Sequence, residues 1–240
     1  MDNLINKLAV YLRSSSFTTV LTGAGMSVES GIPDFRSKSG WWRKIDPRTV
    51  ATIEALESNY DLFHEFYCAR IRGFQECYPH KGHVLLAEWE QTGLIQAIAT
   101  QNVDGFHTVA GSKNVSELHG SIRNFRCNGC GRPANETDFL SKHTCVNCGG
   151  KLRPDIVLFG EMLPEQAWNN ALRNIQISDL VIIIGTSLEV YPVNELPSMT
   201  NGKTVLINKD RLDSYHQFDL NIQGNAKEVL EKTDEIMRAK

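Results

Sequence analysis

The sequence lacks any long hydrophobic run. Within its 240 residues no apolar stretch approaches the ~20 residues that an α-helix needs to cross a bilayer. The first residues, Met1 to Leu4, also lack the basic segment and apolar core that mark an export signal. These absences predict a soluble, cytoplasmic protein with no membrane partner.

The sequence also lacks an excess of positive charge, and it holds few cysteines. The formal net charge is -3 at pH 7, from 25 Lys and Arg against 28 Asp and Glu. A nucleic acid would favour a basic face, so none is expected as a partner. Six cysteines are few for a disulfide scaffold in a chain of this length, which favours a reducing compartment.

Apolar segments with the spacing of helices and strands alternate along a chain of ordinary globular composition, with 41% hydrophobic and 22% charged residues. Helices are expected at 2–15, with Asp2 as a possible cap, at 83–90, closed by Gly93, and at 225–237. Strands are expected at 17–22, 94–100, 115–118, 180–184 and 204–207. This alternation predicts a Rossmann-like, doubly wound parallel α/β sheet. Residues 37–83 show little strand signal and predict a small helical lobe.

A glycine-rich turn follows the first predicted strand. Gly23 and Gly25 stand where a doubly wound sheet binds phosphates, although Val28 replaces the third glycine of the dinucleotide fingerprint. An ordinary turn is the alternative. The loop at 30–36 then brings together a proline, a carboxylate, an aromatic ring and a guanidinium, a combination that a structural loop seldom needs.

Polar side chains follow two further strands. Residues 101–104, Gln-Asn-Val-Asp, come directly after a strand, so they should emerge at the carboxyl edge of the sheet beside the glycine turn. Asn and Asp are also common turn residues, which is the plainer interpretation. His119 follows the 115–118 strand, and an imidazole with a pKa near neutrality suits proton abstraction from a hydroxyl. A histidine standing alone is more often structural.

Four cysteines have the spacing of metal ligands. Cys127-x-x-Cys130 and Cys145-x-x-Cys148 are separated by fourteen residues, as in a zinc ribbon. The alternatives are unrelated core cysteines or two disulfides. A module of ~25 residues is too small for a core of its own, so one structural Zn²⁺ with four thiolate ligands is predicted. The two other cysteines, at 68 and 77, are interpreted as free thiols.

Taken in order, these motifs resemble those of the sirtuins, the NAD-dependent protein lysine deacylases. The shared segments are G-A-G-x-S and G-I-P-D-F-R within 23–36, Q-N-V-D at 101–104, H-G at 119–120, C-x-x-C at 127 and 145, F-G-E at 159–161, G-T-S at 185–187 and I-N at 207–208. The resemblance covers nearly the whole chain. It implies NAD as co-substrate and acyl-lysine proteins or peptides as partners.

The resemblance also implies roles for individual residues. His119 would be the general base, Asn102 would orient a water or ribose hydroxyls, and Asp104 would recognise the nicotinamide carboxamide. The acyl-lysine oxygen would attack C1′ of the ribose as nicotinamide leaves, and a ribose hydroxyl would then carry the acyl group away as 2′-O-acyl-ADP-ribose. The implied cofactor-binding residues are Gly23, Ala24, Gly25, Ser27, Ile32, Pro33, Asp34, Phe35, Arg36, Trp42, Gln101, Asn102, Val103, Asp104, Gly185, Thr186, Ser187, Asn208, Lys209, Asp210 and Ala226.

The implied peptide site lies between residues 157–161 and 189–191, where a substrate backbone would pair as a strand. Tyr67 and Arg70 stand three apart, and such a pair in this lobe resembles the desuccinylase and demalonylase subgroup, because an Arg fork pairs with a terminal carboxylate. A surface arginine is the plain alternative, and Asp34 stands where that subgroup often has Thr. The implied substrate-binding residues are Ala51, Tyr67, Arg70, Val157, Phe159, Gly160, Glu161 and Val190.

The expected domains are a Rossmann-like NAD-binding domain at 1–36, 84–126 and 153–240, a helical insert at 37–83 and a zinc-binding insert at 127–152. Two other functions remain open. An NAD glycohydrolase or protein ADP-ribosyltransferase would use the same pocket without an acyl acceptor. A zinc-stabilised binding module without catalysis is opposed by the absence of a basic stretch.

Overall fold

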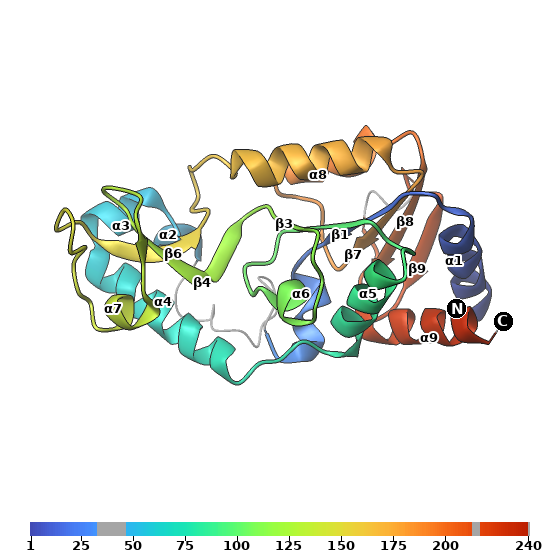
Figure 1. Cartoon of the computed structure of the whole chain (residues 1–240), viewed down its shortest axis with the longest axis horizontal. Helices are drawn as coiled ribbons and strands as arrows, with labels where there is room; N and C mark the ends of the chain where they lie inside the picture. Colours follow the sequence, from blue (N-terminus) through green and yellow to red (C-terminus); the bar gives the residue numbers. More distant parts are fainter. Residues whose placement is uncertain (33–46, 213–216, 240) are drawn as a thin grey trace.

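The computed structural model describes residues 1–32, 47–212 and 217–239. A sheet flanked by helices forms one part of the molecule, and a second lobe built from α2, α3, α4, α7, β4 and β6 lies beside it (Figure 1). Within the described ranges, no helix combines the length and the apolar character needed to cross a membrane.

The main sheet has six strands in the order β3-β2-β1-β7-β8-β9, and every neighbouring pair is parallel. The strands are β1 Thr18–Thr22, β2 Ala97–Thr100, β3 Val115–Glu117, β7 Leu180–Ile184, β8 Lys203–Asn208 and β9 Leu220–Gln223. This order is that of a dinucleotide-binding sheet, so the predicted doubly wound fold is confirmed. The short edge strand β9 was not predicted.

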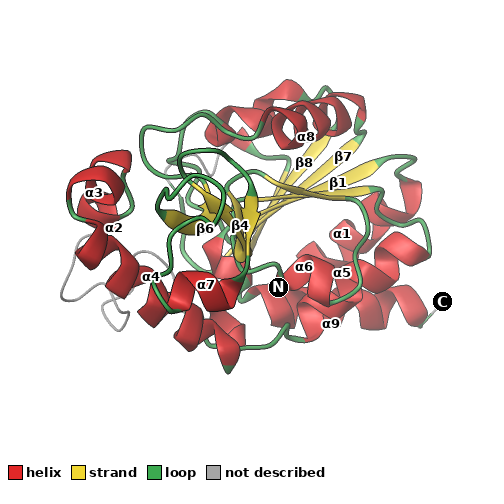
Figure 2. Cartoon of the chain, turned by 60° about the vertical axis from the view of Figure 1, so that its left-hand side comes forward, coloured by secondary structure: helices red, strands yellow, loops and turns green. Residues whose placement is uncertain are grey.

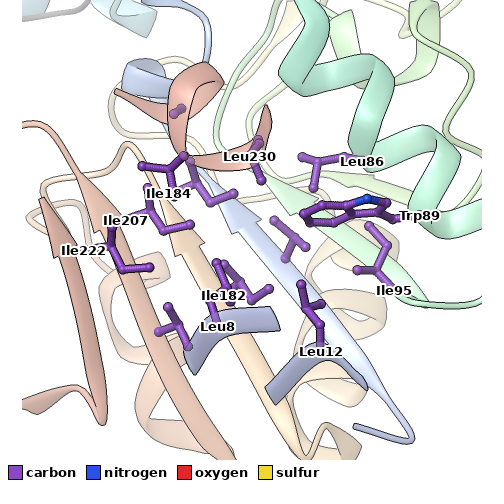
Figure 3. Close-up of a cluster of buried hydrophobic side chains, with 14 of the residues drawn as sticks. Leu8, Leu12, Leu86, Trp89, Ile95, Ile182, Ile184, Ile207, Ile222 and Leu230 are labelled. Carbon is purple, nitrogen blue, oxygen red and sulfur yellow. The ribbon is translucent and has the colours of Figure 1, made fainter. Parts of the chain in front are cut away.

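Helices cover both faces of the sheet (Figure 2). One face packs against α1 Asp2–Ser14, α5 Lys81–Gln91 and α9 Ala226–Arg238, and the other against α8 Glu165–Ile177 and the 3₁₀ helix η4 Val193–Met199. Alternate residues of a strand point to opposite faces. Ile182 and Ile184 therefore join the first core, shown in Figure 3, whereas Val181 and Ile183 join the second.

The helix boundaries differ from prediction at two caps. Helix α1 begins at Asp2 itself and Met1 is its N-cap, so Asp2 is not the cap that the sequence indicated. Helix α5 begins earlier than expected because the His80 side chain is its N-cap, with Nδ1 accepting from Gly82 N at 2.9 Å. Gly93 follows the helix with φ +76°, the left-handed conformation in which a glycine ends a helix, as predicted.

The second lobe combines helices with a small antiparallel sheet of order β5-β4-β6. Its elements are α2 Pro47–Val50, α3 Ile53–Ser58, α4 Tyr60–Gln75, β4 Gly120–Cys127, β5 Pro133–Ala134, α7 Glu136–Leu140 and β6 Leu152–Ile156. Three helices occupy most of residues 47–75, in agreement with the small helical lobe expected at 37–83. The small sheet was not predicted. The domain boundaries stay a prediction, and β4 and β6 extend to both sides of the limits at 127 and 152.

Three shorter elements follow β1 and β2. They are η1 Ala24–Met26, η2 Val28–Ser30 and α6 Phe106–Val109. Three buried histidines lie there, with ring centroids 4.4 Å apart for His80 and His83 and 5.1 Å apart for His83 and His107. Burial lowers the pKa of His83 to about 2 and that of His107 to about 3. Both imidazoles are therefore neutral in the folded protein.

This cluster predicts a loss of stability in mild acid. Because the folded pKa values of His83 and His107 lie below the ordinary value near 6.5, the unfolded chain binds more protons below that pH. The free energy of unfolding should fall by up to about 2 kcal/mol per histidine between pH 7 and pH 5. Urea unfolding followed by tryptophan fluorescence measures it.

In the variant His107→Gln, the free energy of unfolding should fall less between pH 7 and pH 5, by the contribution of one histidine. The matched control is His143→Gln, because the His143 side chain is 64% exposed and its surface contact with Asp138 should affect the slope less than the buried His107 does. An identical slope in wild type and His107→Gln would contradict the assignment.

Candidate functional site

Two turns meet at the carboxyl edge of the sheet, where β1 and β7 are neighbours. Gly25 N donates to Gly185 O at 2.7 Å, and Gly23 N donates to Ile184 O at 3.0 Å. A Cβ on Gly25 would lie 2.7 Å from Gly185 Cα, and one on Gly185 would lie 2.4 Å from Met26 N. Gly185 also has φ +63°. Only glycine fits this contact, which lies at the topological switch point of the sheet.

A buried polar network lies directly beside the glycine turn. Asn102 Nδ2 donates to Gly23 O at 3.0 Å and to Ser27 Oγ at 3.1 Å, while Ser27 Oγ donates to Asp104 Oδ2 at 2.6 Å. Burial raises the pKa of Asp104, and the hydrogen bonds from Ser27 and Phe106 N oppose that shift. The sequence prediction that residues 101–104 lie beside the turn is therefore confirmed by contact.

His119 stands at the end of β3, next to the same network. Its Nδ1 lies 3.0 Å from Gln101 O, and since a carbonyl only accepts, Nδ1 carries the proton and Nε2 is the basic nitrogen. Burial lowers the pKa of His119, although the bond to Gln101 O raises it in part. Gln101 Nε2 in turn donates to Thr186 Oγ1 at 2.9 Å, which links β2 to the turn after β7.

The remaining predicted cofactor residues follow the strands of the same edge. Asn208 ends β8 and its Nδ2 donates to Asp210 O at 3.0 Å, while Ala226 begins α9, which contacts η1. Their contact with a cofactor stays a prediction, as it does for Ala24, Ile32, Val103, Ser187 and Lys209. The predictions at Pro33, Asp34, Phe35, Arg36 and Trp42 lie outside the described residues.

The predicted peptide segment joins His119 to the second lobe. Val157 N donates to His119 O at 2.9 Å, and Phe159 N donates to Ala51 O at 2.8 Å. The Phe159 side chain is 52% exposed, and Val190, on the other predicted segment, is 44% exposed. Exposed apolar side chains therefore occur on both segments to which the sequence assigned the substrate.

The acyl-selectivity pair lies on helix α4. Tyr67 is buried, and this burial raises its pKa to about 12. The Arg70 guanidinium carbon lies 5.9 Å from the Tyr67 ring centroid, so the two residues share a helix face as predicted. Burial lowers the pKa of Arg70, while its interactions with Tyr67 and with the Asp104 carboxylate raise it.

The four zinc-spaced cysteines come together. The sulfurs of Cys127, Cys130, Cys145 and Cys148 all lie within 4.8 Å of one another. The Sγ atoms are 3.5 Å apart for Cys127 and Cys148, and 3.7 Å apart for Cys130 and Cys145. Tetrahedral Zn²⁺ with Zn–S bonds of about 2.3 Å requires sulfurs about 3.8 Å apart, so the cluster fits the ion. All six cysteines are free thiols, which rules out the two-disulfide alternative.

Three contacts around the site were not predicted. His83 Nε2 lies 3.5 Å from Ser27 Oγ, Arg123 Nε donates to Asp104 O at 2.6 Å, and Arg153 binds Glu161. Only the histidine had a sequence signal, because His83 follows His80 at helical spacing. The arginines sit in strands of the small sheet, and that sheet was itself missed.

Comparison with known proteins agrees with this geometry. A family model described as "Sir2 family" matches residues 23–192. The chain is 51% identical over 202 residues to an NAD-dependent protein deacetylase 1 of Geobacillus kaustophilus, covering 82% of this chain and 84% of that protein. It is 41% identical over 246 residues to an NAD-dependent protein deacylase of Pyrococcus furiosus, covering 98% of each.

A solved structure described as "Sir2-p53 peptide-NAD+" superimposes with a TM-score of 0.89 at 34% identity, covering 98% of this chain and 99% of that one. The match includes the glycine turn, residues 101–104, His119 and all four cysteines, and the similarity extends over both parts of the fold. The chain therefore belongs to the Sir2 family.

Proposed function

We propose that this chain is an NAD-dependent protein deacylase, which removes acyl groups from lysine side chains and releases nicotinamide and 2′-O-acyl-ADP-ribose. One observation carries the proposal. A neutral imidazole with a basic Nε2 stands beside the Ser27, Asn102 and Asp104 network, at the edge where this sheet class binds dinucleotides. The named relatives from Geobacillus and Pyrococcus support it.

Each residue of the network has a physical role in this reaction. The absence of side chains at Gly23 and Gly25 lets backbone approach the pyrophosphate of NAD closely. Asn102, held by Gly23 O and Ser27, would orient a water or the ribose hydroxyls, and Asp104 would accept from the nicotinamide amide. His119 Nε2 would take the proton of the hydroxyl that attacks the acyl carbon.

The four-cysteine cluster is closed by its own thiolates, so Zn²⁺ there would stabilise the second lobe and take no part in chemistry. Reduced cysteines suit a reducing compartment, and we place the protein in the cytoplasm, acting on acyl-lysine proteins or peptides.

The decisive test of this function is the identity of the products. Incubation of the protein with NAD and an acetyl-lysine peptide should yield free lysine peptide, nicotinamide and 2′-O-acyl-ADP-ribose by mass spectrometry. The variant His119→Ala should lower deacylation roughly 10²- to 10⁴-fold, because it removes the general base.

Formation of ADP-ribose with the acyl peptide unchanged would contradict the proposal and favour an NAD glycohydrolase. Transfer of ADP-ribose to protein would favour a transferase. A chain that neither binds nor consumes NAD would be a binding module. The matched control for His119→Ala is the exposed His143→Ala, which should keep wild-type turnover.

We further propose that the acyl site accepts succinyl and malonyl groups as well as acetyl. The support is the Tyr67 and Arg70 pair on one face of α4, where the Asp104 carboxylate contributes to raising the pKa of Arg70. A guanidinium in that position would form a fork with the terminal carboxylate of an acidic acyl chain, and the Tyr67 hydroxyl would add a third contact.

The variant Arg70→Met should lower turnover of a succinyl-lysine peptide roughly tens- to thousands-fold, because an unpaired buried carboxylate costs about 2–5 kcal/mol. Turnover of the matched acetyl peptide should change far less. Arg72→Met is the control, since Arg72 lies exposed on the same helix. Equal losses on both peptides would mean that Arg70 only supports the fold.

A further inference from the structure

One arginine of the small sheet is completely buried. The Arg153 side chain, on β6, has 0% exposure and is the largest fully buried side chain in the described part of the chain. Burying a guanidinium is costly unless its donors are satisfied. The acceptors of its N–H groups therefore show which groups this arginine can hold in place.

The partners of Arg153 converge on one carboxylate. Nη1 donates to Glu161 Oε1 at 2.6 Å and Nη2 donates to Glu161 Oε2 at 2.8 Å, which is a bidentate fork. Nη2 also donates to Ile156 O at 2.6 Å. Nη1 further lies 3.4 Å from Asn128 Oδ1, in the turn between two of the clustered cysteines. The arginine therefore connects that turn with the segment after β6.

Glu161 in turn closes the segment that follows β6. Its Oε2 accepts from Leu158 N at 2.8 Å, and its own N donates to Leu158 O at 3.0 Å. Gly160, inside this turn, has φ +93°. Because Val157 is bonded to His119 and Phe159 to Ala51, the Glu161 carboxylate is the third tie that fixes the segment 157–161.

We propose that Arg153 is a positioning residue for the acyl-lysine peptide: by gripping Glu161 it fixes the 157–161 segment against which the substrate backbone pairs. This inference rests on the proposed function and deepens it. Arg153 is fully buried behind the segment, so it acts through Glu161 and touches no substrate. Glu161, which the sequence assigned to substrate binding, then serves the peptide through its grip on the Leu158 backbone.

The test separates peptide binding from NAD binding. In Arg153→Met, the KM for an acetyl-lysine peptide should rise about 10- to 100-fold, since a small displacement of a positioning segment has effects of that order. The KM for NAD should stay within about threefold, because the segment lies outside the glycine turn. Fluorescence anisotropy of a labelled acetyl peptide gives the same shift without turnover.

Arg126→Met is the matched control. Arg126 lies opposite Arg153 in the backbone register of β4 and β6. Its Nη2 lies 3.7 Å from Glu161 Oε1, but its side chain is 28% exposed. We expect a change in peptide KM of less than about threefold, as for a partly exposed ion pair.

The double variant Arg153→Met/Glu161→Leu distinguishes positioning from simple stability. Replacing a buried ion pair by apolar side chains restores stability in many proteins. The melting temperature should therefore recover towards wild type, while peptide binding stays weak because Leu158 N has lost its acceptor. Recovery of peptide binding together with the melting temperature would overturn the inference, as would wild-type peptide binding in Arg153→Met.

The wild-type arm tests the proposed function separately. If wild-type protein neither binds nor deacylates the acetyl peptide, both the function and this inference fail. If wild type binds it and Arg153→Met raises the KM for NAD as much as that for the peptide, the inference alone fails.

Discussion

The site depends on a close backbone contact between the turns that follow β1 and β7. Gly25 and Gly185 approach so closely that neither can carry a Cβ, and their hydrogen bond is 2.7 Å long. The helices that follow these two strands pack on opposite faces of the sheet, α5 on one and η4 on the other, which makes this junction the switch point where sheets of this class bind ligands. Ser27, two residues after Gly25, then bonds to Asn102 and Asp104 in the segment that follows β2.

Parallel strands then bring the chemistry to that edge. The segments after β2 and β3 supply Asn102, Asp104 and His119, and each is held by a backbone or hydroxyl partner in the turn after a neighbouring strand. The burial that holds these groups also shifts their pKa values, raising that of Asp104 and lowering that of His119. The 157–161 segment connects this edge to the second lobe, because Val157 N donates to His119 O and Phe159 N donates to Ala51 O. Position and protonation state thus have a common cause.

The sequence predicted those parts of the fold that local pattern encodes. A run such as Leu180–Ile184 is apolar throughout because both faces of its strand are covered. Paired C-x-x-C turns have a spacing typical of structural zinc sites. The edge strand Leu220–Gln223 and the half-exposed β4 carry no such pattern. Partners far apart in the chain, such as Arg123 with Asp104, follow only from the small sheet's register, so sequence reasoning missed them. Helix capping by His80 was missed because histidine is an uncommon cap.

The most direct test of the account is a comparison of NAD affinity, measured by calorimetry, between Gly185→Ala and the control Gly93→Ala. Both glycines have positive φ, +63° and +76°, but a Cβ on Gly93 would meet nothing within 4 Å, whereas one on Gly185 would meet Met26 N at 2.4 Å. Gly93→Ala should lose about 1 kcal/mol of stability and bind NAD normally. Folded Gly185→Ala should bind NAD at least about tenfold more weakly, since the cradle must shift. Wild-type affinity in folded Gly185→Ala would contradict the account.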